Sequence, residues 1–298
     1  MPSGKTELLH DQAQGLDTMD PAAVVRLLAQ GQQAAAASVD AAADAIVEAA
    51  LVAADCLKAG GRLVYAGAGS SGLMALADAL ELPGTYGLRH DQVVILLAGG
   101  VASLSDLAGG YEDDTGLARQ NVSEVSVSAK DCVICLTASG STPYALAVAD
   151  EAKARGARVV GIANNPGAAL FECSDIAVLL ETPPEVVSGS TRMGAGTAQK
   201  IALNMFSTLI GIRLGHVHDG HMVNLKADNI KLRGRACRIV SEIAGVEPSE
   251  AGRLLDAASG SVKLAILMAA GATDAHEAER VLSASNENLR LALASIAS

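Results

Sequence analysis

Three loops rich in glycine and hydroxyl side chains hold the residues best suited to chemistry. They read GAGSSG (67–72), TASGSTPY (137–144) and GSTRMGAGTAQK (189–200), and each precedes a stretch typical of a helix. The first amide N–H groups of a helix lack intrahelical acceptors and carry partial positive charge, so such loops bind phosphate. The predicted anion-binding residues are Gly69, Ser70, Ser71, Ser139, Gly140, Ser141, Thr142, Ser190, Thr191 and Arg192.

Two of these loops have alternative interpretations. GAGSSG fits the dinucleotide pattern G-x-G-x-x-G, but the following strand ends in LLAGGVAS, without the acidic residue that would hold a ribose. This disfavours nicotinamide or flavin binding. In TASGSTPY, Thr142 alone could cap the next helix. That interpretation explains one hydroxyl and leaves three unexplained, which favours an anion site.

Cysteine and histidine spacings invite redox or metal interpretations. Cys132 and Cys135 match C-x-x-C. Side chains three residues apart in a strand point to opposite faces, so we expect these cysteines to share no metal and to form no disulfide. The run HVHDGH places His216, His218 and His221 close together. A solvated turn explains this run with fewer assumptions than a metal site, and a histidine that transfers a proton in catalysis is a further possibility.

Apolar strands alternate with helical segments over the middle of the chain. Strands are expected at GRLVYAG, QVVILLAGG, DCVICLTAS, ARVVGIANN and DIAVLLE. This alternation predicts an α/β fold, a five-stranded parallel sheet flanked by helices in three layers. In such a sheet the three loops meet at one edge.

Helical segments flank this core on both sides. Residues 21–58 are Ala-rich and predict two helices packed outside the sheet, the first capped by Asp20 before Pro21. From about Arg233 the pattern is entirely helical, with Asp274 and Glu277 spaced as a capping box. We therefore expect N-terminal helices over 1–52, a domain built on the parallel sheet over 53–216, and a linker with a small C-terminal helical domain over 217–298.

Composition excludes several classes of partner. A net charge of −11 argues against nucleic acid and anionic membranes, which need clustered Lys and Arg. The apolar runs are far shorter than the roughly 20 residues of a membrane helix. The opening MPSGKTELLHDQ has no apolar core of a signal peptide, and five scattered cysteines suit a reducing compartment. These features predict a cytoplasmic protein.

The loops together resemble a known family. GAGSSG, TASGSTP and GSTRMGAGTAQK are similar to motifs of the sugar isomerase (SIS) domain, and more closely of the N-acetylmuramic acid 6-phosphate etherases. The similarity runs from TELLHDQAQGLDTMD through ELPGTYG and GGYEDD to NIKL and the helical tail. It implies an SIS-type fold and a homodimer with its active site near the interface. It also implies that the protein uses no metal and no organic cofactor.

The resemblance also implies a reaction. The D-lactyl ether of a phosphorylated amino sugar would be cleaved by elimination of lactate and addition of water. Glu81 in LELPGTYG and Glu112 in GGYEDD match the family's two catalytic glutamates. By this analogy Glu81 is the acid toward lactate and Glu112 the base toward C2 or water.

Some positions depart from the family pattern. Leu73, Ser141 and Gly194 stand where the family's loops usually carry cations, so anion binding here would rely on Arg192 and neutral donors. Two alternatives to the lyase stay open. One is a phosphosugar aldose–ketose isomerase, and the other is a non-catalytic regulator that binds a sugar phosphate.

Overall fold

The computed structural model describes residues 4–106, 109–225, 227 and 229–297. The chain forms two compact units. The first comprises Met1–Ala79 and Asp91–Ser207, and the second comprises Leu80–His90 and Thr208–Ser298. Two long helices, α3 (Gly69–Tyr86) and α7 (Gly194–Arg213), contribute residues to both units.

A parallel sheet forms the centre of the first unit, which confirms the predicted fold class. Its five strands are all parallel and follow the order β2-β1-β3-β4-β5. Apolar residues fill β1 and β3, which are buried on both faces, as a sheet covered by helices requires. The strands are β1 (Leu63–Gly67), β2 (Val93–Leu97), β3 (Cys132–Thr137), β4 (Arg158–Ala163) and β5 (Ile176–Leu179).

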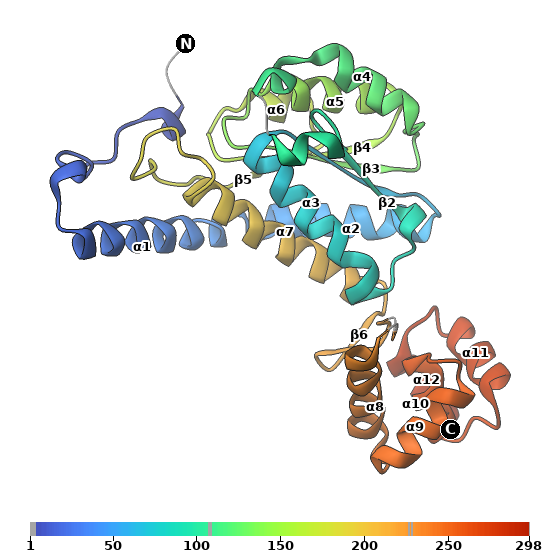
Figure 1. Cartoon of the computed structure of the whole chain (residues 1–298). Coiled ribbons are helices and arrows are strands. Elements are labelled where there is room, and N and C mark those ends of the chain that lie inside the picture. Colours follow the sequence, from blue (N-terminus) through green and yellow to red (C-terminus); the bar gives the residue numbers. More distant parts are fainter. Residues whose placement is uncertain (1–3, 107–108, 226, 228, 298) are drawn as a thin grey trace. The chain divides into compact units, whose positions relative to one another are not determined.

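Helices cover both faces of the sheet (Figure 1). On one face α4 (Thr115–Glu124) and α5 (Pro143–Ala154) pack on alternate strand residues such as Val64, Val133 and Cys135, close to the short α6 (Ala169–Glu172). On the other face lie α2 (Ala43–Lys58) and the first parts of α3 (Gly69–Tyr86) and α7 (Gly194–Arg213).

A buried polar cluster ties the second face together. The hydroxyl of Tyr65 on β1 donates to Asp78 on α3 at 2.9 Å, and Ser207 on α7 donates to the same carboxylate at 2.9 Å. Because Asp78 is buried, these hydrogen bonds offset the cost of removing its carboxylate from water. The cluster therefore fixes the position of α3, whose first turn borders the site described below.

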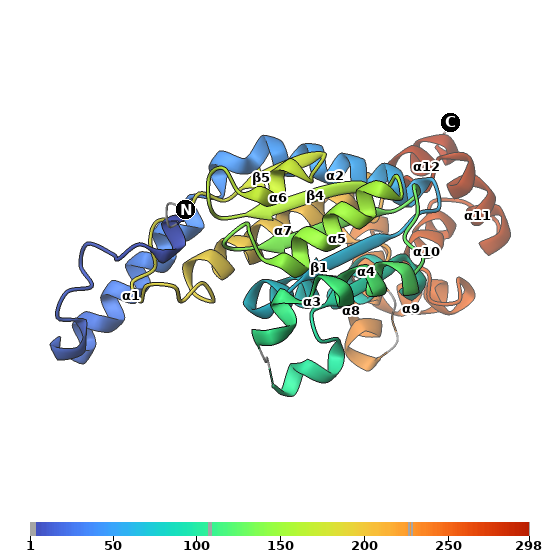
Figure 2. The ribbon, with the colours of Figure 1, turned by 90° about the horizontal axis from the view of Figure 1, so that it is seen from above.

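The N-terminal helix α1 (Pro21–Ala37) begins at its predicted cap, where the Asp20 carboxylate accepts from the amides of Ala22 and Ala23. Only a small part of this helix is buried. It extends beyond the sheet in both views, and Leu27 and Ala35 are its only fully buried side chains among the described residues (Figures 1 and 2). An Ala-rich helix buries little apolar area, so it gains little from docking on a sheet.

The second unit contains the predicted C-terminal helices (Figure 2, orange to red). They enclose their own apolar core, to which Ile239, Leu255 and Ile266 contribute. The capping box differs in detail, because Asp274 caps the amide of Glu277 while the Glu277 carboxylate accepts from Thr273. The helices are α8 (Ile230–Ala244), α9 (Pro248–Ala257), α10 (Val262–Ala269), α11 (Ala275–Ala284) and α12 (Leu289–Ile296).

Candidate functional site

A polar cavity of about 370 Å³ opens at the carboxyl ends of the central strands. The predicted loops after β1 and β3 both reach it, as open α/β sheets favour. The loop before α7 also contributes to the wall of the cavity. The lining residues are Glu7, Ala68, Gly69, Ser70, Ser71, Glu112, Thr137, Ala138, Ser139, Thr142, Gly189 and Thr191.

The loop between β3 and α5 is held by its own hydroxyl groups. Thr137 Oγ1 lies 2.6 Å from Thr142 Oγ1 and 3.2 Å from Ser139 Oγ. The amide of Ser141 donates to Ser139 Oγ at 3.2 Å. Thr142 stands at the N-cap position of α5, but its side chain makes no capping hydrogen bond. The hydroxyls are thus organised around each other rather than used for the helix cap.

The Glu112 carboxylate lies directly over the start of α3. It is carried by a 3₁₀ turn, Gly109–Asp113, in the connection after β2. A Cβ atom on Gly69, where φ is +50°, would lie only 2.6 Å from Glu112 Oε1. Burial, together with the negative charge of Asp113, raises the pKa of the half-buried Glu112. A carboxylate with a raised pKa binds a proton more strongly than an ordinary surface glutamate does.

The N-terminus of α7 is already occupied by a carboxylate of the protein itself. Buried Glu185 accepts from the amides of Gly194 and Ala195, both at 2.9 Å. These amides were expected to contribute to anion binding, but Glu185 satisfies them. Gly189 and Thr191 in the same loop do line the cavity. Glu185 was not found from the sequence because it lies nine residues before the helix it caps.

Several predicted binding residues lie outside this cavity lining. Gly140 and Ser141 belong to the β3–α5 loop, and Ser190 and Arg192 to the loop before α7, yet none of these four lines the cavity. Arg192 is exposed. Among the described lining residues there is no Lys or Arg, so neutral amide and hydroxyl groups are the donors that the cavity itself offers an anion.

Glu81 lies well along α3 rather than in a loop. It is exposed and does not line the cavity. At 1.5 Å per helical residue, its Cα stands about 18 Å from that of Gly69 along the helix axis. The pattern match that selected Glu81 says nothing about this distance.

The histidine run forms a small antiparallel hairpin, β6 (Val217–His218) and β7 (His221–Met222). Burial, together with the charge of Lys263, lowers the pKa of His216 to about 4. No cluster of metal-ligating side chains occurs among residues the structure describes. Cys132 and Cys135 are both free thiols in β3, and only Cys135 belongs to the core under α4 and α5, as opposite faces require.

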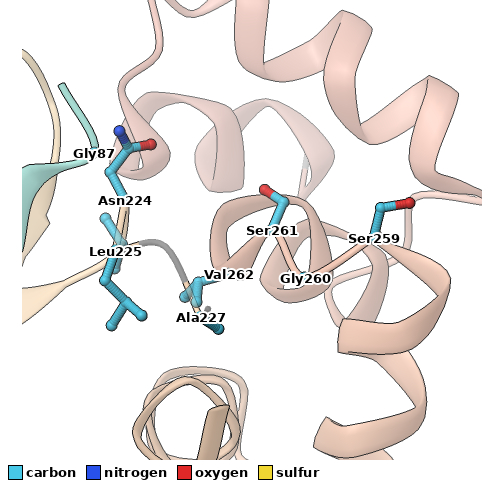
Figure 3. Close-up of a pocket in the computed structure, with 9 residues that line it drawn as sticks. Gly87, Asn224, Leu225, Ala227, Ser259, Gly260, Ser261 and Val262 are labelled. Atoms are coloured by element: carbon cyan, nitrogen blue, oxygen red, sulfur yellow. The ribbon is translucent and has the colours of Figure 1, made fainter. Parts of the chain in front are cut away.

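The C-terminal unit has a cavity of its own, of about 460 Å³ (Figure 3). Asn224, Ser259 and Ser261 supply its polar side chains. Two of these are engaged structurally, since Asn224 donates to the carbonyl of Tyr86 and Ser261 caps α10. We assign no chemistry to this cavity.

Comparison with known proteins agrees with the architecture. Residues 27–164 match the SIS domain family. A protein of Bacteroides fragilis, a candidate phosphosugar isomerase involved in capsule formation, has the same fold with a TM-score of 0.50. It is 18% identical, and the match covers 66% of this chain and 94% of that one.

Two curated relatives match over nearly their whole length. The N-acetylmuramic acid 6-phosphate etherase of Deinococcus radiodurans is 41% identical over 289 residues, covering 97% of this chain and 95% of the relative. That of Serratia proteamaculans is 39% identical over 288 residues, covering 97% of both. The chain belongs to the N-acetylmuramic acid 6-phosphate etherase family.

Membership of the etherase family confirms the resemblance carried by the three loops. It covers both units, including the C-terminal helices that lie outside the SIS match. Among the described helices, none is long and apolar enough to cross a membrane.

Proposed function

We propose that this protein is a carbon–oxygen lyase that cleaves the D-lactyl ether of N-acetylmuramic acid 6-phosphate. The products are lactate and N-acetylglucosamine 6-phosphate. The observation that carries this proposal is the Glu112 carboxylate, with its raised pKa, at the wall of a hydroxyl-lined cavity. The phosphate would bind the first-turn amides of α3 together with Ser70, Ser71 and Ser139.

Proton transfers divide between two carboxyl groups. In the open-chain sugar, the proton on C2 is acidic because C1 is an aldehyde, and Glu112 removes it. The bond from C3 to the lactyl oxygen then breaks, and Glu81 protonates that oxygen because an alkoxide is a poor leaving group. Water adds to C3 of the resulting double bond, and a proton returns to C2.

The distance along α3 suggests how Glu81 takes part. A glutamate side chain spans far less than about 18 Å, the rise between residues 69 and 81 of a helix. We therefore propose that the protein works as a homodimer and that Glu81 of one subunit serves the cavity of the other. This places the active site near the subunit interface.

We further propose that the enzyme acts in the cytoplasm, in the recycling of peptidoglycan. The five cysteines are free thiols, as a reducing compartment favours. The substrate class supports the pathway, since N-acetylmuramic acid is a sugar of peptidoglycan.

Lactate release tests the reaction directly. The wild type incubated with N-acetylmuramic acid 6-phosphate should release lactate, and Glu112→Gln should lower kcat at least 100-fold by removing the base. Glu124→Gln, an exposed carboxylate on α4, is the matched control. Absence of lactate with conversion of a hexosamine 6-phosphate to a ketose would instead identify an isomerase. Binding of that ligand without turnover would identify a regulator.

Mixed dimers test the placement of Glu81. Glu81→Gln and Glu112→Gln should each be inactive, and co-expression with two different tags isolates the mixed species. If each site combines Glu81 and Glu112 from different subunits, a mixed dimer keeps one intact site of its two. The isolated mixed dimer should then have about half of the wild-type activity, and the unseparated statistical mixture about a quarter, given two-fold symmetry. Mixed dimers as inactive as either parent would refute the shared site.

A further inference from the structure

The proposed reaction leaves one proton transfer without a residue. Amino sugar 6-phosphates exist mainly as closed rings, and C2 becomes acidic only after C1 is released as an aldehyde. Opening the ring requires removal of the proton from the C1 hydroxyl and delivery of a proton to the ring oxygen. Glu112 acts at C2 and Glu81 at C3, so a third group must act at C1.

A second carboxylate lines the cavity beside Glu112. Glu7 and Glu112 are the two titratable side chains among its described lining residues. Glu7 Oε2 lies 3.4 Å from the position of a Cβ on Gly189, which places it over the loop before α7. Glu112 lies instead over Gly69 of α3. The two carboxylates thus stand at different parts of one cavity.

The N-terminal segment is fastened to the cavity wall by specific hydrogen bonds. Buried Thr6 accepts from the side chain of Asn165 at 3.0 Å, and its amide donates back to Asn165 at 3.3 Å. The carbonyl of Thr6 accepts from the amide of Gly189 at 3.1 Å, and the carbonyl of Glu7 accepts from Ser188 Oγ at 3.0 Å. Four bonds around one dipeptide hold Glu7 at the cavity mouth, where its side chain is exposed.

The chemistry of the ligand indicates which atoms Glu7 would meet. In a hexose 6-phosphate the ring oxygen is bonded to C5, next to the carbon that carries the phosphate ester, and C1 follows it. C3 lies across the ring from that oxygen. A carboxylate beside the bound phosphate would therefore lie close to the ring oxygen and C1, whereas the acid at C3 would come from farther away, as proposed for Glu81.

We propose that Glu7 is a catalytic residue that opens the sugar ring, an inference that rests on the proposed function. The Glu7 carboxylate takes the proton of the C1 hydroxyl as the C1 oxygen becomes a carbonyl. The bond from C1 to the ring oxygen breaks, its electron pair stays on that oxygen, and the carboxyl group returns its proton there. No proton is gained or lost over the step.

A permanently open substrate separates this role from all others. N-acetylmuramic acid 6-phosphate lacking the C4 and C5 hydroxyls cannot close a five- or six-membered ring. Glu7→Gln should lower kcat for lactate release from the natural substrate about 100-fold, the usual contribution of a general acid–base group. Its KM should stay within about threefold of wild type, and on the open analogue it should match wild type.

The controls distinguish the possible failures. Asp17→Asn, an exposed carboxylate in the same N-terminal segment, should behave as wild type on both substrates. Equal losses of Glu7→Gln on both substrates, or no loss on either, would overturn the ring-opening role. A wild type inactive on both substrates would mean instead that the proposed lyase reaction is wrong. Partial activity of Glu7→Asp on the natural substrate would give further support.

Discussion

Replacing Gly69 by alanine tests whether activity depends on the position of the Glu112 carboxylate rather than on the stability of the fold. The added Cβ would stand 2.6 Å from Glu112 Oε1, whereas ordinary contacts begin near 3.4 Å. The carboxylate must therefore move by about 1 Å, and a misplacement of that size can cost about 100-fold in rate. The backbone also resists, because a φ of +50° strains any residue with a Cβ by about 1–2 kcal/mol.

Gly167 supplies a matched control for the backbone strain. It has a φ of +70°, and a Cβ added there would meet nothing within 4 Å. Gly167→Ala should therefore lose similar stability while keeping its activity. We expect both variants to melt roughly 2–8 °C below wild type, and only Gly69→Ala to lose about 100-fold in kcat for lactate release.

Thermal melting and steady-state lactate assays on the same preparations decide the outcome. If Gly69→Ala keeps the kcat of Gly167→Ala, the contact with Glu112 does not position the base. If its activity returns fully at higher substrate concentration, the substitution has affected binding rather than the carboxylate. Either result would refute the reasoning from the close approach.

Two further predictions concern charged groups outside the cavity. Arg62→Ala should cost about 3 kcal/mol in urea unfolding, because it leaves the buried Asp131 carboxylate, 2% exposed, without its cation. Burial raises the pKa of Asp131, but hydrogen bonding from Arg62 outweighs it and lowers that pKa below 3.8 in the folded state. The stabilisation from this pair is therefore present above pH 3.8 and is lost as the pH falls through the pKa of folded Asp131. Urea titrations should show the stabilities of wild type and Arg62→Ala closer together at pH 3 than at pH 7. Burial lowers the pKa of His216 to about 4. The stability that the neutral His216 side chain contributes is therefore fully present above pH 6.5 and is lost as the pH falls toward 4. Wild type should thus lose more thermal stability between pH 7 and pH 4.5 than His216→Leu, and equal losses would contradict this.

The sheet and its loops could be predicted because their signals are local. An apolar run such as DCVICLTAS fixes a buried strand, and the hydroxyl-rich sequence after it fixes the place where the strand ends. The parallel arrangement then brings the ends of β1 and β3 together without further information. Residues 70, 71, 139 and 142 line the cavity because they belong to these two loops.

The contributions of Glu7 and Glu185 could not be predicted, because the contacts that position them follow no sequence pattern. Glu7 reaches the cavity only because Thr6 binds Asn165, 159 residues away. Glu185 satisfies the first amides of α7, a place the sequence suggested for a ligand. Neither pairing leaves a periodic pattern, so no window of sequence reveals it. For Glu81 the opposite holds. Its motif is easily recognised in the sequence, but its distance from the cavity depends on its position along α3.

The neutral character of the cavity has a consequence for Glu112. The resemblance found in the sequence places Leu73, Ser141 and Gly194 where the family's loops usually carry cations, and no Lys or Arg stands among the described lining residues. A cation close to Glu112 would stabilise the charged carboxylate and lower its pKa. In the absence of such a cation, burial and the negative charge of Asp113 raise the pKa of Glu112. A base of higher pKa binds the C2 proton more strongly. Weaker binding of the phosphate, which loses charge-assisted hydrogen bonds, thus accompanies a stronger base. Introducing a lysine at a lining residue by Ser70→Lys should therefore lower both KM and the pKa governing kcat, and a pH–rate profile identical to wild type would show that the two properties are independent.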